Sequence, residues 1–96
     1  MRTEIWKCWI NPGRAYTLNG GKTAVIVSVL SAREPQTVTA AVLSKSSYVA
    51  EVLLDGLLQW MHFSVHWYPP DGEPQVWYAP HSEDMQPGSW TRAHLL

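Results

Sequence analysis

Two histidines four residues apart, His62 and His66, have side chains that could do chemistry. Imidazole binds transition metals and titrates near neutral pH, so the pair could hold an ion or exchange protons. On a helix this spacing places both rings on one face, where a single zinc ion could bind them. On a strand the rings also share a face, but they stand about 13 Å apart at roughly 3.3 Å per residue, which is too far for one ion.

The residues around the pair favour the strand. Positions 60–68 alternate between apolar side chains and polar or amphipathic ones, which is the period of a strand buried on one side. The apolar set is Met61, Phe63, Val65 and Trp67. The opposite set is Trp60, His62, Ser64, His66 and Tyr68. We therefore expect an aromatic and histidine-rich face here, with no metal site.

The sequence does not supply the full set of catalytic groups that an active site on this face would need. Glu51 and Asp55 precede the strand and could approach His62, but Asp55 suits a turn and Glu51 alternates with apolar neighbours as a solvated residue does. No nucleophile accompanies them. Cys8 lies beside Lys7, which could make its thiol reactive, although a free cysteine is more commonly a small buried side chain. These residues favour a binding protein over an enzyme, with no catalytic residue and no cofactor.

The composition narrows the class of partner. Seven Lys and Arg residues stand against eight Asp and Glu, so the chain offers no concentrated positive charge to a duplex phosphate backbone. Six tryptophans and four tyrosines stand against one phenylalanine, and rings with a polar atom suit interfaces and pocket walls. No apolar run is long enough to span a bilayer, and a single cysteine excludes an intramolecular disulfide. We expect a cytoplasmic protein without membrane contact. Its partner is predicted to be a protein or a small molecule. The short length and unusual composition are typical of genes carried on mobile elements.

Turn signals divide the rest of the chain into short strands. Asn19-Gly20-Gly21 separates two apolar runs and predicts a hairpin. Residues 23–30 are apolar on both faces, which predicts a central strand covered on both sides. A polar connection over 31–35 and a further strand over 36–43 follow. The prolines of residues 69–74 exclude a central strand there.

Residues 46–58 allow two structures. A helix would be capped at Ser46 or Ser47 and would bury an apolar stripe, but Gly56 near its centre costs about 1 kcal/mol relative to alanine. A hairpin would turn at Asp55-Gly56, a preferred two-residue loop. We expect the hairpin and keep the helix as the alternative.

These elements together predict a single mainly-β domain over residues 1–96, with a β core over 1–79 and an irregular C-terminal tail over 80–96. A small antiparallel, strongly bent sheet or an SH3-like barrel would close such strands, with one short helix around 46–58 as the alternative. The SH3-like comparison concerns architecture only, because no motif supports it. The expected core residues are Val25, Ile26, Val27, Val38, Met61, Phe63, Val65 and Trp67.

The predicted function is that of a non-enzymatic interaction module, which contacts a protein or a second copy of itself. The expected partner-binding residues are Trp60, His62, His66 and Tyr68, with Trp77 and Tyr78 at the rim. Three alternatives stay open. The C-terminal segment could fold back over the face with Trp77, Tyr78 or Trp90. A small-ligand-binding protein or small enzyme would have a pocket between the face and the Pro-rich loop 69–74, and a single-strand nucleic-acid binder would stack bases on the rings.

Overall fold

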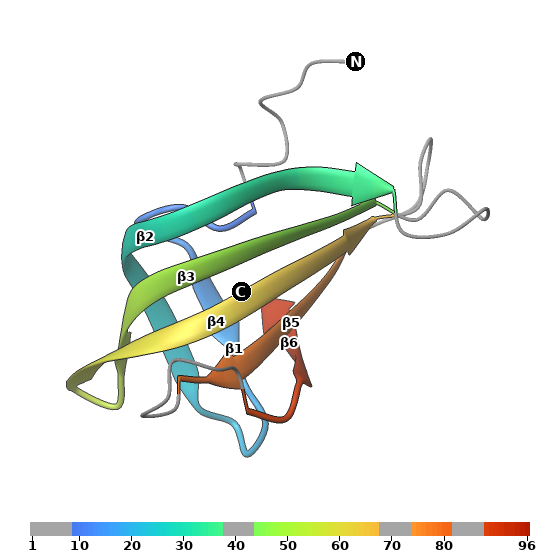
Figure 1. Ribbon diagram of the computed structural model, residues 1–96. Coiled ribbons are helices and arrows are strands. Elements are labelled where there is room, and N and C mark those ends of the chain that lie inside the picture. The colour runs from blue at the N-terminus through green and yellow to red at the C-terminus, as the bar shows by residue number, and fades with distance from the viewer. Residues whose placement is uncertain (1–8, 38–43, 68–73, 82–87) are drawn as a thin grey trace.

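The strands of this protein close into a barrel. The computed structural model describes residues 9–37, 44–67, 74–81 and 88–96, and their side chains except those of 34–37, 44 and 67. These residues form no helix and six strands: β1 (Ala15–Thr17), β2 (Thr23–Thr37), β3 (Ser44–Leu54), β4 (Leu57–Trp67), β5 (Gln75–Pro80) and β6 (Thr91–Leu95). Each strand pairs antiparallel with the next, and β6 also pairs with β1 (Figure 1). The mainly-β fold class is confirmed as a small closed barrel, whereas the SH3-like comparison stays a prediction.

Both predicted hairpin turns are confirmed. Gly20 and Gly21 lie between β1 and β2 with φ of 84° and 78°. Asp55 and Gly56 join β3 to β4 with φ of 51° and 81°, and positive φ at both residues gives a turn whose twist matches that of the strands. The helix alternative for residues 46–58 is wrong, because these residues belong to β3, the turn and the start of β4.

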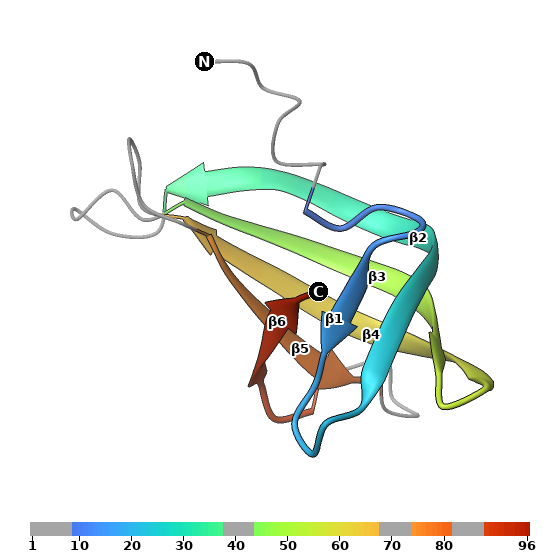
Figure 2. The same cartoon turned by 180° about the vertical axis from the view of Figure 1, so that it is seen from behind.

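The C-terminal residues 80–96 are not irregular throughout, as the sequence had suggested. Residues 91–95 form β6, in which Ala93 lies opposite Val76 of β5 and Leu95 lies opposite Tyr16 of β1. Five residues are too few to show a clear alternation, and two flanking ladders stabilise the strand instead. Figure 2 shows β6 beside β1, where the barrel closes.

β2 is one bent strand of 15 residues, not a strand, a connection and a second strand. Its register against β3 shifts after residues 26, 29 and 33. Such bulges bend a strand and increase its twist, so the polar stretch 31–35 is accommodated within β2. The expected strand over 36–43 lies within β2 only as far as residue 37, and residues 38–43 lie outside the described part of the chain. β2, β3 and β4 thus form a long curved wall that the shorter strands close (Figures 1 and 2).

Alternate residues of the strands fill the barrel. Tyr16 of β1 and Phe63 of β4 are fully buried, with ring centroids 6.1 Å apart. The expected core positions that are buried are Ile26, Met61, Phe63 and Val65. Two others, Val38 and the side chain of Trp67, lie outside the described residues.

Val25 and Val27 depart from the expected core. Val27 is 43% exposed and Val25 is only half-buried. Ile26 enters the barrel, so its two neighbours point outward. In the described part of the chain no second layer covers the outside of β2, because all six strands belong to the one barrel. The expectation of a strand covered on both sides is therefore wrong.

Candidate functional site

The alternation along β4 separates an inner from an outer set of side chains. Met61, Phe63 and Val65 enter the barrel, whereas His62 and His66 are half-buried on its outer surface. The ladders continue this surface onto both neighbouring strands, because Ser64 lies opposite Ser47 of β3 and Trp77 of β5. Residues paired in this way share a side of the sheet.

Two residues from the C-terminal third complete the outer surface. His81, just after β5, contacts both His62 and Trp60. Trp90, just before β6, lines hollows beside His62 and beside His66. We call this surface the tryptophan–histidine face, which consists of Lys45, Trp60, His62, Ser64, His66, Trp77, His81 and Trp90.

Most of the predicted contact residues lie on this face. Those that do are Trp60, His62, His66 and Trp77. Tyr78 does not, because it lies opposite Phe63 and packs against the core, where its hydroxyl accepts a hydrogen bond from the Asn19 main-chain N–H at 3.1 Å. Adjacent residues of a strand point to opposite sides, so Trp77 and Tyr78 could not both face outward. Tyr68 lies outside the described residues.

Three rings cluster at one end of the face. His62 Nε2 lies 2.9 Å from His81 Nδ1, and Trp60 packs edge-to-face against His81 with centroids 5.3 Å apart. Trp60 is 44% exposed. Burial lowers the pKa of His62 below its ordinary value of 6.5, and the charge of His81 lowers that pKa further. His62 is therefore a neutral imidazole at neutral pH.

A recess of about 200 Å³ lies at the other end of the face. Its lining residues are Lys45, Ser64, His66, Trp77 and Trp90. His66 Nε2 lies 3.0 Å from Ser64 Oγ, and the Arg92 guanidinium lies 5.5 Å from the centroid of the Trp77 ring. Burial lowers the pKa of His66, and the charges of Lys45 and Arg92 lower that pKa further. Two cations therefore make the recess electropositive, which suits a small anion.

Trp90 covers only part of the face. Its side chain is 40% exposed and lies between the recess and a second hollow of about 400 Å³, which Arg33 and His62 also line. Within the described residues of the C-terminal segment, Trp90 and His81 lie beside the β4 histidines, and Trp60 stays exposed. The described residues of this segment therefore cover the face in part, and residues 82–87 lie outside the described part of the chain.

An aliphatic patch, made of Val27, Leu53 and Leu58, adjoins the face near the β3–β4 turn. Leu58 is 59% exposed, and Val27 and Leu53 are exposed as well. Leu58 lies opposite Leu53 and two residues before Trp60, so the patch is continuous with the ring cluster. The sequence did not predict this patch, because Val27 was expected to lie in the core. A strand apolar on both faces, in a chain too short for a second layer, is the signal that could have revealed it.

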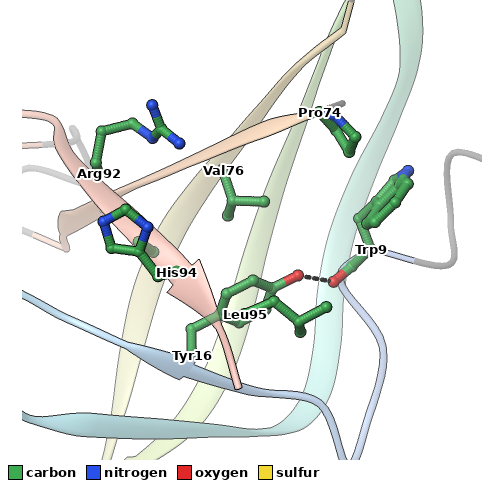
Figure 3. Close-up of a pocket in the computed structure, with 8 residues that line it drawn as sticks. Trp9, Tyr16, Pro74, Val76, Arg92, His94 and Leu95 are labelled. Atoms are coloured by element: carbon green, nitrogen blue, oxygen red, sulfur yellow. Dashed lines mark hydrogen bonds between the residues drawn. The ribbon is translucent and has the colours of Figure 1, made fainter. Parts of the chain in front are cut away.

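A cavity of about 410 Å³ lies at other strands, between β5, β6 and β1. In Figure 3, Val76 and Tyr16 lie between Trp9 on one side and Arg92 on the other. The Tyr16 hydroxyl donates a hydrogen bond to the main-chain carbonyl of Trp9. Burial raises the pKa of Tyr16 to about 12, although the charge of Arg14 opposes this shift. Tyr16 is therefore a structural donor, held in its protonated form at neutral pH.

The two carboxylates considered for acid–base chemistry lie on the β3–β4 hairpin. Glu51 lies opposite Trp60 in the β3–β4 ladder, and Asp55 occupies the turn. Among the described residues, no three of His, Cys, Asp and Glu lie close enough together to hold one metal ion. Cys8 lies outside the described residues.

No protein-family model matches the chain, and no match emerges from the curated proteins or from the solved structures. The part of the chain that the structure describes contains no helix long and apolar enough to cross a bilayer. The chemistry of the tryptophan–histidine face and its aliphatic patch is therefore what indicates a function.

Proposed function

We propose that the protein is a non-enzymatic interaction module that binds a second copy of itself. The contact is made by the aliphatic patch and the adjoining end of the tryptophan–histidine face. The observation that carries the proposal is the exposure of Leu53 and Leu58, which lie opposite each other, beside the exposed indole of Trp60. Large contiguous apolar patches are rare on monomeric proteins and mark sites of association.

Burial of the patch supplies the driving force. Fully burying one leucine side chain contributes roughly 1.5–3 kcal/mol. Leu53 and Leu58 together, with help from Val27, therefore offset part of the free energy that association costs. Trp60 adds area at the edge of the patch, and tryptophan is enriched among the residues that dominate binding.

The patch is suited to a second copy as its partner. A two-fold axis through it sets each patch against the same patch of the other chain. All three of its residues are uncharged, so the central contact brings no like charges together. The ring cluster of Trp60, His62 and His81 then lies at the border of the contact, where polar side chains are normally found.

Light scattering and sedimentation equilibrium over a wide range of protein concentration test the proposal. We expect the mass to rise from that of one chain towards that of two. Leu58→Lys places a charge in the patch without altering the core and should weaken the dimer at least tenfold, about 1.4 kcal/mol. Leu96→Lys, at an exposed leucine that follows β6, is the matched control and should change nothing. A mass of one chain at every concentration, or an equal effect of both variants, contradicts the proposal.

A second candidate function is the binding of a small anionic ligand, and the electropositive recess favours it. The predicted pocket beside the Pro-rich loop 69–74 stays a prediction, because residues 69–73 lie outside the described part of the chain and the recess is lined by residues of the face alone. Titration with benzoate, followed by NMR at the Trp77 indole and the His66 ring, tests this candidate. Saturable shifts that disappear in Lys45→Gln are expected, and shifts that persist in that variant contradict it.

A further inference from the structure

The imidazoles of His62 and His81 meet on the tryptophan–histidine face. His62 Nε2 lies 2.9 Å from His81 Nδ1, the ring planes are within 18° of parallel, and the centroids are 5.1 Å apart. Rings whose nitrogens are this close while their centroids are this far apart meet by their nitrogen edges rather than their faces. Each of these two nitrogens therefore directs its lone pair or its proton towards the other ring.

We infer that His62 and His81 together bind a divalent transition-metal ion of the class of Zn²⁺, Ni²⁺ or Cu²⁺ in place of the proton they share. Imidazole nitrogen is a common protein ligand for these ions. The site is not the one that the spacing of His62 and His66 suggested, because its second ring comes from the end of β5 and not from β4. It lies at the border of the proposed self-association contact, which the aliphatic patch drives.

The fold holds the two rings in place. His62 lies opposite Ala79, two residues before His81, so the rings are diagonal neighbours on one side of the sheet. Trp60 packs against His81 with their ring planes at 66°, which restricts rotation of that imidazole. An ion that binds here therefore finds both ligands already close together, and little side-chain entropy is lost on binding.

An ion requires one of the rings to move. A tetrahedral Zn²⁺ bound at about 2.0–2.1 Å sets two ligand nitrogens roughly 3.3–3.4 Å apart, so the observed contact must lengthen by about 0.4 Å and the His62 ring must turn. Rotation of the His62 side chain can make this change while Trp60 holds the ring of His81. Among the described residues no third His, Cys or carboxylate joins the pair, so water or an added ligand fills the other positions.

Calorimetric titration of chelator-treated protein with ZnCl₂ and with NiCl₂ tests the site. Saturable binding of no more than one ion per chain is expected. His62→Gln and His81→Gln should each weaken it at least about tenfold, since removing even an outer-shell partner costs this much. His66→Gln, on the same face, and His94→Gln, on β6, are matched controls that should bind as the wild type does. Circular dichroism verifies that each variant is folded.

NMR provides a second readout that does not depend on affinity. Zn²⁺ should shift the imidazole signals of His62 and His81 and the indole signal of Trp60, and it should leave those of His66 unchanged. Absence of saturable binding, or an equal loss in the two control variants, overturns the inference. When the mass measurements are made in the presence of a chelator, failure of self-association and failure of metal binding are distinguishable.

Discussion

The Tyr16 hydroxyl donates a hydrogen bond to the main-chain carbonyl of Trp9, seven residues earlier in the chain. The ring of Tyr16 is fully buried on β1, and Ile10, the residue after Trp9, is buried in the same core cluster. This contact ties the segment that precedes β1 to the barrel interior. The barrel is therefore sealed partly by a segment that belongs to none of its strands.

Tyr16→Phe should lower the free energy of unfolding by about 1 kcal/mol, the usual net contribution of one hydrogen bond. Urea unfolding measures this change. Tyr78→Phe is the control, because its hydroxyl accepts from the exposed Asn19 N–H and its loss should cost less, about 0.5 kcal/mol or below. If both variants lose the same free energy of unfolding, the buried hydrogen bond to Trp9 stabilises the fold no more than the exposed one to Asn19 does.

Tyr16 should also make stability depend on alkaline pH. Its folded pKa of about 12 lies above the ordinary value of 10, so the folded state holds the proton more tightly than the unfolded state does. The contribution of protonated Tyr16 to the free energy of unfolding is therefore fully present below pH 10 and is lost as the pH rises towards 12. The stability difference between wild type and Tyr16→Phe should narrow over this range in thermal unfolding. A difference that stays constant contradicts the assignment.

Lys45→Gln should raise the pKa of His66. Burial is the largest cause of the lowered pKa of this imidazole, and the charges of Lys45 and Arg92 add to it. Removing one charge should move the pKa of His66 towards 6.5 and leave that of His62 unchanged, as NMR titration of the two rings can show. Because the folded pKa is depressed, the associated stability is present above pH 6.5 and lost as the pH falls, so the variant should lose less of it on acidification. Lys22→Gln, at the β1–β2 turn, should have neither effect.

Gly56→Ala should destabilise the β3–β4 hairpin by about 1–2 kcal/mol. Gly56 has φ of 81°, and a Cβ added there would meet no atom within 4 Å, so the cost arises from the backbone and not from a clash. Asp55→Asn keeps a residue that tolerates positive φ and should be nearly neutral. Urea unfolding compares the two variants. Equal stability of Gly56→Ala and wild type would mean that the turn can adopt another conformation.

Local patterns predicted those parts of the fold that local physics controls. The alternation through Met61, Phe63 and Val65 defined both the strand and its buried side. The Asp55-Gly56 turn defined the hairpin, since its backbone requirement is met within two residues. β6 was missed, because five residues carry too little pattern and their stability comes from β1 and β5. The sequence predicted two strands and a connection where the structure has the single strand β2. Bulges in β2 accommodate the polar stretch that the sequence assigned to a connection.

The candidate site shows the same division. The sequence alone determined that His62 and His66 share the outside of one strand, since side chains two positions apart always return to the same side. Which rings join them was decided by the tertiary structure, which brings His81 within 2.9 Å of His62 and places Trp90 beside His66. The exposure of Val27 and Leu58 was decided there too, because it depends on whether a second layer covers the barrel wall. Orientation along a strand is a property of neighbouring residues, whereas contact and exposure depend on segments far apart in the chain.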